Sequence, residues 1–204
     1  TRPLAYQDGG IGVVRCSTAG RGVTMNVRII AGEYGGRIIE GSGTSRTHPM
    51  GERVRNALFN KLHMELQGAD VLDAFAGSGA LGLESISRGA RSATFIEKDR
   101  VAQKIIAKNI EQLHADHKAH LIRATVSASV KTLDKTFDII FADPPYYNPQ
   151  FPSIKKLFRL LKPNGLMVLS YPGKDEVPTG AEVVVVDNRS YGNAHLVFYR
   201  KKDA

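Results

Sequence analysis

The stretch DAFAGSGALG, Asp73 to Gly82, decides the fold because it leads from an apolar run into the start of a predicted helix. Gly77, Gly79 and Gly82 have the G-x-G-x-x-G spacing, which lets the backbone turn tightly and approach a ligand closely. In an open parallel sheet such a turn lies beyond the carboxyl end of a strand, where ligands bind. The stretch therefore predicts an α/β fold with a ligand site at this turn.

Strand and helix patterns alternate along the chain around this turn. Apolar residues at helical spacing predict a helix over 54–66 and further helices that begin near Leu81, Arg100 and Phe151. A turn is expected at KPNG, residues 162–165. The alternation predicts a Rossmann-like, seven-stranded, mostly parallel sheet with helices on both faces and an antiparallel last pair of strands. The predicted strands are DVLDAFA, ATFIE, HLIRATV, FDIIFA, LMVLSY, EVVVVDN and HLVFYR.

The region before residue 53 has a different pattern. Residues 1–24 are rich in Gly, Ser and Thr without a sustained period, which predicts a flexible leader. Residues 25–52 include NVRIIAGEYGGRIIEG, in which two short apolar runs flank a Gly-rich turn. This pattern predicts a small N-terminal β-hairpin extension followed by a loop. Residues 53–204 then form the α/β domain.

Composition excludes several classes of protein. The chain has 204 residues, of which 42% are hydrophobic, so it can bury a sizeable core. It contains no apolar run of the roughly 18 residues that a membrane span needs, which favours a cytoplasmic protein without a membrane partner. The single cysteine, Cys16, excludes an intramolecular disulfide and a Cys-based zinc site, and we expect no metal. Cys16 has no sign of a paired base, so a catalytic role is not expected.

The turn at Asp73 allows two kinds of ligand. Glu97 ends the next predicted strand 20 positions after Gly77, as in dinucleotide-binding proteins, so NAD is one candidate. Asp73, however, would place a negative charge next to a pyrophosphate. A cationic ligand such as S-adenosylmethionine suits that charge better, because it carries a sulfonium and an ammonium and no phosphate. The alternative interpretations are an N-terminal helix cap for Asp73 and a surface position for Glu97.

A second stretch, FADPPYYNP from Phe141 to Pro149, follows the apolar run FDIIFA. Together with DAFAGSG and Glu97 it resembles the class I methyltransferases that act on exocyclic amino groups. Such an amine is a poor nucleophile, and Asp143 with the carbonyl of Pro144 can accept its two hydrogens. Two prolines hold these acceptors rigid, and Tyr146 offers a face on which an extruded base can stack. A Pro-rich turn with an aromatic lid is the alternative interpretation.

The flanking segments resemble one family more closely. VRIIAGEYGGRII, HPMGERVRNALFN, DAFAGSGALGLESISRGA, ADPPY and SYGNAHLVFY are similar, in that order, to the bacterial small-subunit (16S) ribosomal RNA guanine-N2 methyltransferases. The resemblance covers residues 26–200 and implies that residues 53–204 are a class I methyltransferase domain that uses S-adenosylmethionine. It implies catalytic roles for Asp143, Pro144, Pro145 and Tyr146, cofactor binding by Asp73, Phe75, Gly77, Ser78, Gly79, Glu97, Lys98 and Thr125, and RNA binding by Arg37, His48, Arg53 and Arg55.

Two positions depart from the family pattern. The family usually has R-P-T where this chain has H-P-M, so His48 and Met50 replace an arginine and a threonine. After the third predicted strand the family usually has an Asp near the cofactor adenine, and the nearest position here is Thr125. Adenine recognition would then fall to a serine or to backbone groups.

The charge of the chain agrees with a polyanionic partner. The net charge is +8, and residues 1–61 hold nine Lys or Arg against four acidic residues. The resemblance implies ribosomal RNA in a small-subunit particle as the partner, and we expect a monomer. Two other functions remain open: a DNA adenine-N6 or cytosine-N4 methyltransferase with the same D-P-P-Y chemistry, and a basic RNA-binding module without catalysis.

Overall fold

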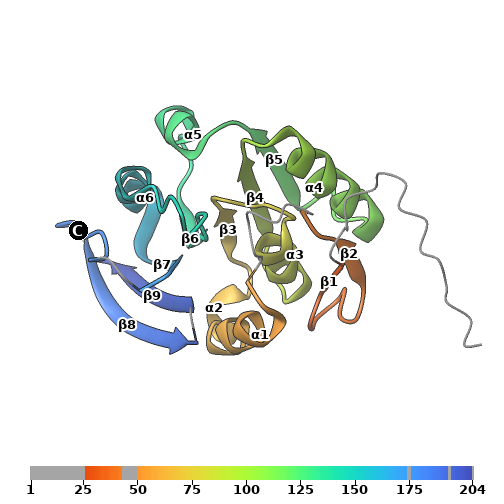
Figure 1. Ribbon diagram of the computed structural model, residues 1–204, viewed down its shortest axis with the longest axis horizontal. Helices are drawn as coiled ribbons and strands as arrows, with labels where there is room; N and C mark the ends of the chain where they lie inside the picture. The colour runs from red at the N-terminus through yellow and green to blue at the C-terminus, as the bar shows by residue number, and fades with distance from the viewer. Residues whose placement is uncertain (1–25, 43–49, 174–175, 193, 204) are drawn as a thin grey trace, which may run out of the picture.

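The computed structural model describes residues 26–42, 50–173, 176–192 and 194–203 (Figure 1). The leader predicted for residues 1–24 lies outside these described residues. The elements are β1 (Asn26–Arg28), β2 (Ile38–Glu40), α1 (Glu52–Lys61), α2 (His63–Leu66), β3 (Asp70–Asp73), α3 (Ala80–Ser87), β4 (Ser92–Glu97), α4 (Arg100–Leu113), β5 (Ala119–Arg123), α5 (Val126–Thr132), β6 (Phe137–Ala142), α6 (Phe151–Leu157), the 3-10 helix η1 (Phe158–Leu160), β7 (Leu161–Tyr171), β8 (Val183–Tyr191) and β9 (Ala194–Lys201).

The large sheet has seven strands in the order β5-β4-β3-β6-β7-β9-β8. Strands β3 to β7 pair in parallel with their neighbours, whereas β9 pairs antiparallel with both β7 and β8. This confirms the predicted mostly parallel sheet and its antiparallel last pair. The chain builds outward from β3 in one direction through β4 and β5, and then in the other through β6 and β7. The switch point, where such sheets bind ligands, therefore lies at the carboxyl ends of β3 and β6.

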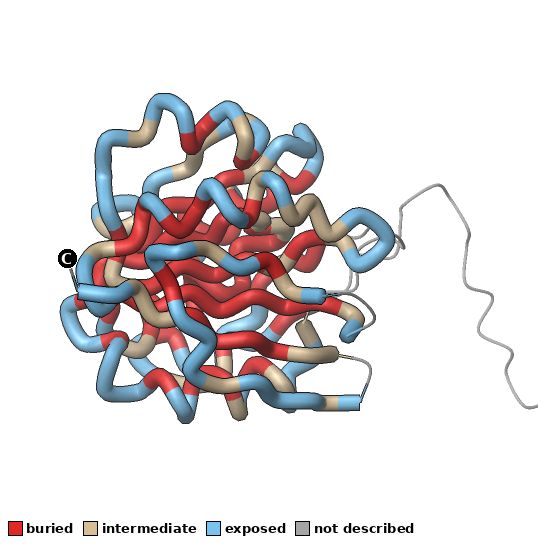
Figure 2. The backbone as a smooth tube through the Cα atoms, turned by 90° about the vertical axis from the view of Figure 1, so that its left-hand side faces the viewer, coloured by how far each residue is buried: buried red, intermediate tan, exposed pale blue. Residues whose placement is uncertain are grey.

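Two apolar cores cover the two faces of the sheet. One joins the sheet to α1, α3, α4 and the hairpin, through side chains such as Phe59, Leu83 and Ile106. The other joins it to α5 and α6, through side chains such as Val130 and Ile154. In Figure 2 the strands form a buried layer between more exposed segments. Helices on both faces are thus confirmed, as the right-handed crossovers of a parallel sheet require.

The predicted N-terminal hairpin is present, with β1 antiparallel to β2, and it is fixed to α3. The carboxylate of Glu84, which is fully buried, accepts hydrogen bonds from the backbone N–H groups of Ile30 at 2.7 Å and Ala31 at 3.2 Å. Gly32 has a φ of +84°, and a Cβ added there would lie 1.8 Å from the carbonyl oxygen of Ser87. This close approach requires glycine, so the hairpin is packed into the fold.

One helix was missing from the sequence prediction. The predicted strand HLIRATV is shorter in the structure, because β5 ends at Arg123 and α5 begins at Val126. The side chain of Thr125 accepts a hydrogen bond from the backbone N–H of Ala128 at 3.2 Å, which caps the new helix. The segment VSASVKT is short and rich in small polar residues, so its apolar spacing gave little helical signal.

Two boundaries also differ. The single helix predicted over 54–66 is divided, because α1 ends at Lys61 and α2 begins at His63. The turn predicted at 162–165 lies inside β7. There the ladder passes from the pair Phe137–Leu161 to the pair Ile139–Leu166, and Asn164 has a φ of +58°. The KPNG segment is therefore an irregularity within a longer strand.

Candidate active site

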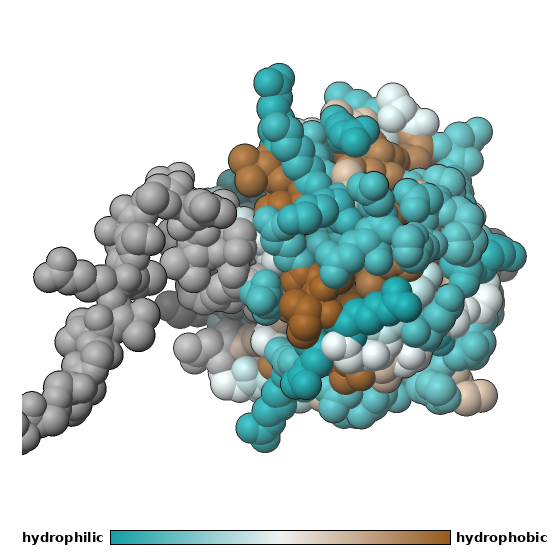
Figure 3. Space-filling view, turned by 90° about the vertical axis from the view of Figure 1, so that its right-hand side faces the viewer, coloured by the Kyte–Doolittle hydropathy of each residue, from teal (hydrophilic) through white to brown (hydrophobic). Residues whose placement is uncertain are grey.

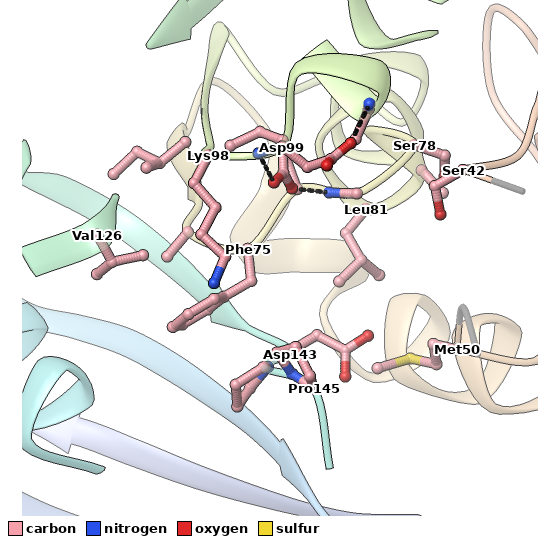
Figure 4. Close-up of a pocket in the computed structure, with 18 of the residues that line it drawn as sticks. Ser42, Met50, Phe75, Ser78, Leu81, Lys98, Asp99, Val126, Asp143 and Pro145 are labelled. Atoms are coloured by element: carbon pink, nitrogen blue, oxygen red, sulfur yellow. Dashed lines mark hydrogen bonds between the residues drawn. The ribbon is translucent and has the colours of Figure 1, made fainter. Parts of the chain in front are cut away.

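A pocket of about 630 Å³ opens at the switch point (Figure 4). Its walls come from the turns after β3, β4 and β6, the starts of α4 and α5, the residues before α1, and the β8–β9 turn. The lining residues are Ser42, Met50, Gly51, Arg55, Ala74, Phe75, Ala76, Gly77, Ser78, Ala80, Leu81, Ile96, Glu97, Lys98, Asp99, Ala102, Ala124, Thr125, Val126, Asp143, Pro144, Pro145, Tyr146, Tyr147, Gln150, Tyr191 and Ala194.

The glycines of the β3–α3 turn serve different purposes. Gly77 and Gly79 have φ values of +56° and +79°, which other residues rarely adopt. Gly77 lines the pocket, and a Cβ there would meet only the Ser42 hydroxyl oxygen at 3.8 Å. A Cβ on Gly82 would lie 2.2 Å from the ring of Phe95. The first two glycines therefore shape the turn, and the third allows α3 to pack closely on the sheet.

Glu97 holds two walls of the pocket together. One carboxylate oxygen accepts a hydrogen bond from the Gly77 N–H at 2.8 Å, and the other accepts one from the Asp99 N–H at 2.8 Å. Asp99 in turn caps α4 by accepting from the backbone N–H groups of Val101 and Ala102, both at 2.9 Å. A carboxylate has about four acceptor positions, so Glu97 can still accept hydrogen bonds from ligand hydroxyls.

Asp73 lies behind the pocket wall and does not line it. It is 1% exposed, and one of its oxygens accepts a hydrogen bond from the Gly82 N–H at 3.0 Å. The other oxygen has no partner among the described residues. Burial, together with the charges of Asp143 and Glu97, raises the pKa of Asp73 to about 7, although the hydrogen bond from Gly82 lowers it. Direct cofactor contact was expected from Asp73 and Gly79, and neither reaches the pocket surface.

The D-P-P-Y segment forms another wall. Asp143 is half-buried, and burial raises its pKa to about 6, although the neighbouring Ser170 hydroxyl lowers it. The hydroxyls of Tyr146 and Ser170 are hydrogen-bonded at 2.9 Å. The carbonyl of Pro145 accepts from the N–H of Asn148 at 2.8 Å, which closes the turn. The segment thus presents a carboxylate at the pocket with a tethered aromatic ring beside it.

Of the remaining predicted cofactor residues, Phe75, Lys98 and Thr125 line one side of the pocket, and Ser78 lines another, near Ser42. In Figure 4 the amine of Lys98 points toward the ring of Phe75, with Val126 on the same side. Thr125 lines the pocket as the N-cap of α5. Its hydroxyl oxygen accepts the hydrogen bond that caps α5, and its O–H can still donate to a ligand.

The predicted RNA-binding residues are spread out. Arg37 and Arg53 are exposed and do not line the pocket, and the Arg37 guanidinium lies 5.5 Å from the centre of the Tyr34 ring. Arg55 differs from the prediction of an RNA-binding residue, because it is only 3% exposed. Its guanidinium donates to the backbone carbonyls of Arg28 and Met50, so it supports the pocket wall and is not on the surface. His48 lies outside the described residues.

Several lining residues were not predicted. Tyr147 is 71% exposed at the pocket and directly follows the D-P-P-Y motif. Tyr191 and Ala194 lie in the stretch SYGNAHLVFY, whose family resemblance was the available signal. Ser170 does not line the pocket but contacts Tyr146, and it gave no signal because it reads as one more residue of the predicted strand LMVLSY. Its importance depends on β7 lying next to β6 in the sheet.

Two kinds of feature are absent from the part of the chain that the structure describes. It has no group of three or more His, Cys, Asp or Glu side chains that could hold a metal ion. None of its helices is both long and apolar enough to cross a bilayer.

The chemistry of the pocket fits S-adenosylmethionine. Carboxylates from Glu97, Asp99 and Asp143 line it, and the buried Asp73 oxygen without a partner adds a fourth acid behind the wall. Such a site favours a cation. The Gly77 turn leaves open space next to an acid that can bind hydroxyls. The fold and the site define a class I, S-adenosylmethionine-dependent methyltransferase.

Comparison with known proteins identifies the family. Residues 27–200 match the family model described as Conserved hypothetical protein 95, and the chain belongs to that family. Ribosomal RNA small subunit methyltransferase D of Escherichia coli (strain K12) is 36% identical over 139 residues, which cover 68% of each chain. The protein of the same name from Haemophilus influenzae is 36% identical over 147 residues, covering 69% of this chain and 76% of that protein.

A solved structure from Escherichia coli, described as a candidate methyltransferase (yhhF), has the same fold. It superposes with a TM-score of 0.78 at 30% identity and covers 88% of this chain and all of its own. The predictions of a methyltransferase of this family and of S-adenosylmethionine as its cofactor are confirmed.

Proposed function

We propose that the protein transfers a methyl group from S-adenosylmethionine to the exocyclic N2 amine of a guanine in small-subunit ribosomal RNA. The observation that carries this proposal is the position of Asp143 and Pro144 at the end of β6, in the same pocket as Glu97 and the Gly77 turn. An acceptor pair for an amine and a binding site for the cofactor thus share one cavity.

The cofactor occupies the part of the pocket between the β3–α3 turn and α5. Glu97 accepts hydrogen bonds from its ribose hydroxyls, and Phe75 and Val126 contact its adenine. Gly77, Ser78, Lys98 and Thr125 complete this wall, whereas Asp73 acts through its negative charge from behind it. When bound, S-adenosylmethionine supplies an electrophilic methyl group on a positively charged sulfur.

The catalytic contribution of the chain is to orient the amine and to stabilise the charge that develops on its nitrogen. The Asp143 carboxylate and the Pro144 carbonyl oxygen accept the two N–H groups of the exocyclic amine. This directs the nitrogen lone pair into the pocket and stabilises the positive charge that develops on nitrogen. Because the prolines fix the backbone, little reorganisation is needed during the reaction. The ionised form of Asp143 is the active one, and its pKa of about 6 keeps it largely ionised at neutral pH.

Tyr146 and Ser170 position the target base. The hydrogen bond between their hydroxyls fixes the tyrosine ring at the pocket, where it stacks on an extruded base. Tyr147, which is mostly exposed next to it, is placed to contact a neighbouring nucleotide. A flipped-out base thus meets an aromatic face and two hydrogen-bond acceptors.

Ribosomal RNA is favoured over DNA as the substrate by the names of the two relatives that are 36% identical. The net charge of +8 agrees with any nucleic acid and does not discriminate. An adenine N6 or a cytosine N4 amine would satisfy the same two acceptors, so guanine N2 follows from the family resemblance. We propose that the enzyme acts as a monomer on RNA within a small-subunit particle.

The test measures which nucleoside becomes methylated. Labelled S-adenosylmethionine is supplied with small subunits, free ribosomal RNA and DNA from a strain that lacks the enzyme, and the digested products are identified by mass spectrometry. We expect N2-methylguanosine in ribosomal RNA from the wild-type protein and from a control variant at the exposed Asp116, Asp116→Asn. N6-methyladenine in DNA with unmodified ribosomal RNA would overturn the substrate and leave the amine chemistry in place.

A further inference from the structure

Helix α4 carries a basic stripe on the side away from its buried face. Arg100, Lys104 and Lys108 recur every four residues, so they lie on one side of the helix about 6 Å apart along its axis. All three are exposed. With Arg123 from the end of β5 they line a groove of about 550 Å³, which we call the α4 groove. Its lining residues are Arg100, Gln103, Lys104, Ala107, Lys108, Glu111 and Arg123.

Most of the positive charges of the α4 groove have no ion-pair partner in the part of the chain that the structure describes. Among the described residues, no carboxylate lies within salt-bridge distance of Arg100, Lys104 or Arg123. Lys108 pairs with Glu40 at 2.5 Å, and its side chain remains 65% exposed. Glu111 is the single acid among the lining residues. The groove therefore offers a local excess of cations to an anionic partner.

Helix stability does not explain this arrangement. A helix favours acidic residues in its first turn and basic residues in its last, because of its dipole. Helix α4 has no acidic residue in its first turn and no basic residue in its last, while Arg100 is its first residue and Glu111 lies near its end. The charges thus run against the dipole. Asp99 caps the helix but is engaged with backbone N–H groups.

The α4 groove lies next to the proposed active site. Asp99 and Ala102, at the start of the same helix, line the active-site pocket, and Arg100 stands between them in sequence. In Figure 1, β5 and the neighbouring α4 lie at one edge of the sheet, and β8 and β9 lie at the other. Figure 3 views the edge with β5 and α4 and shows hydrophilic side chains over most of it, around a smaller apolar patch. A chain that enters the pocket can therefore continue along α4.

We propose that the α4 groove binds the phosphate backbone of the RNA beside the target nucleotide. The inference rests on the proposed function and adds a binding surface to it, separate from the hairpin and from Arg37 and Arg53. Evenly spaced cations suit phosphates, which position a nucleic acid without reading its sequence. The groove thus fixes the register of the substrate, and the D-P-P-Y wall selects the amine.

The test compares two double variants that each remove two positive charges. Arg100→Gln/Lys104→Gln changes the α4 groove, and Lys131→Gln/Lys155→Gln changes exposed residues on α5 and α6, which cover the opposite face of the sheet. Glutamine keeps the helix propensity close to that of Arg and Lys. RNA binding is measured across a series of salt concentrations, together with S-adenosylmethionine affinity and the steady-state constants for RNA methylation.

We expect the α4 double variant to bind RNA roughly tenfold more weakly at low salt, with a log–log salt slope smaller by about two units. Its KM for RNA should rise, while its S-adenosylmethionine affinity stays at the wild-type value. The control should change the slope little. If both variants have the same slope and KM while both form N2-methylguanosine, the α4 groove is not an RNA surface and the proposed function stands. A wild-type protein that neither binds nor methylates ribosomal RNA would overturn both.

Discussion

The two ends of strand β3 carry the same residue in opposite surroundings. At the amino end Asp70 contacts the guanidinium of Arg91, the Ser92 hydroxyl at 2.7 Å and the Lys162 amine at 3.3 Å. These partners, Arg91 first, hold the pKa of Asp70 well below its usual range. At the carboxyl end Asp73 has one backbone hydrogen bond and, within the described part of the chain, no cation beside it, and burial raises its pKa to about 7.

This difference indicates that the amino end of β3 stabilises the fold, whereas its carboxyl end belongs to the ligand site. The acid at the amino end is satisfied by the protein's own cations, as a stabilising network requires. The acids at the carboxyl ends of β3 and of the neighbouring β6, Asp73 and Asp143, are left without a cation among the described residues, and both have raised pKa values. Such an arrangement lowers the stability of the protein alone and favours a cationic ligand. The comparison predicts that substitutions at the two ends affect different properties.

The largest effect is expected from Asp143→Asn. An asparagine has a similar shape and keeps one acceptor oxygen, but it has no charge to stabilise the positive charge that develops on the amine, so the methylation rate should fall by about 100-fold or more. The folding stability should not decrease, because a buried charge is removed. Single-turnover transfer from labelled S-adenosylmethionine and urea unfolding measure the two properties, with Asp116→Asn as the control. An unchanged rate would mean that the D-P-P-Y segment is only a turn.

The next largest effect is expected from Asp70→Ala, and it concerns the stability of the fold. The substitution removes charge-assisted hydrogen bonds to Arg91, Ser92 and Lys162 and should lower the free energy of unfolding by about 2 kcal/mol. The rate of methylation per folded molecule should stay the same. Urea unfolding with an unchanged m-value checks the first part. If Asp70→Ala kept wild-type stability but lost activity, the amino end of β3 would serve function and not stability.

A smaller effect, with a defined pH dependence, is expected from Asp73→Asn. The folded pKa of Asp73, about 7, is raised above the unfolded value of about 3.9. A raised folded pKa contributes stability at low pH that is lost as the pH rises through 7. The variant, which keeps an acceptor for the Gly82 N–H, should therefore match the wild type near pH 4. Near pH 8 it should be more stable on the order of 1 kcal/mol.

Urea unfolding at a series of pH values tests this sign. Parallel curves for the wild type and Asp73→Asn would show that Asp73 titrates normally. A variant that is less stable at pH 8 would show that the carboxylate is stabilised by a partner.

Local patterns were sufficient to predict the architecture and the two motifs, after β3 and after β6, that form part of the pocket wall. The positive φ values of Gly77 and Gly79 and the rigid Pro144–Pro145 pair are properties of the residues themselves, so the sequence reveals them. The strand order then brings their segments together, because the carboxyl ends of parallel strands share one edge. The charge of Asp73 was interpreted as favourable for a cation, and its position behind the wall was not predicted.

What the sequence could not show depends on contacts between distant segments. The burial of Arg55 follows from its bonds to the backbone of Arg28 and Met50, whereas its place among exposed arginines suggested a surface residue. Ser170 acquires its role only because β7 lies beside β6. The α4 groove needs the end of β5 next to the helix. None of these contacts has a local signature.

The smallest effect is expected from Lys135→Ala at the amino end of the sheet. The amine of Lys135 lies 3.6 Å from an oxygen of Asp70, and its side chain is 43% exposed. Solvent screens such a pair, so the free energy of unfolding should fall by no more than about 0.5 kcal/mol. Lys162 is different, because its amine contacts both Asp70 and Asp138, at 3.3 Å and 2.7 Å. Lys162→Ala should therefore destabilise more than Lys135→Ala in the same urea experiment, and the smaller effect should disappear at high salt. If the two substitutions lowered the free energy of unfolding by the same amount, Asp70 would be stabilised by the general positive charge around it and not by specific hydrogen bonds.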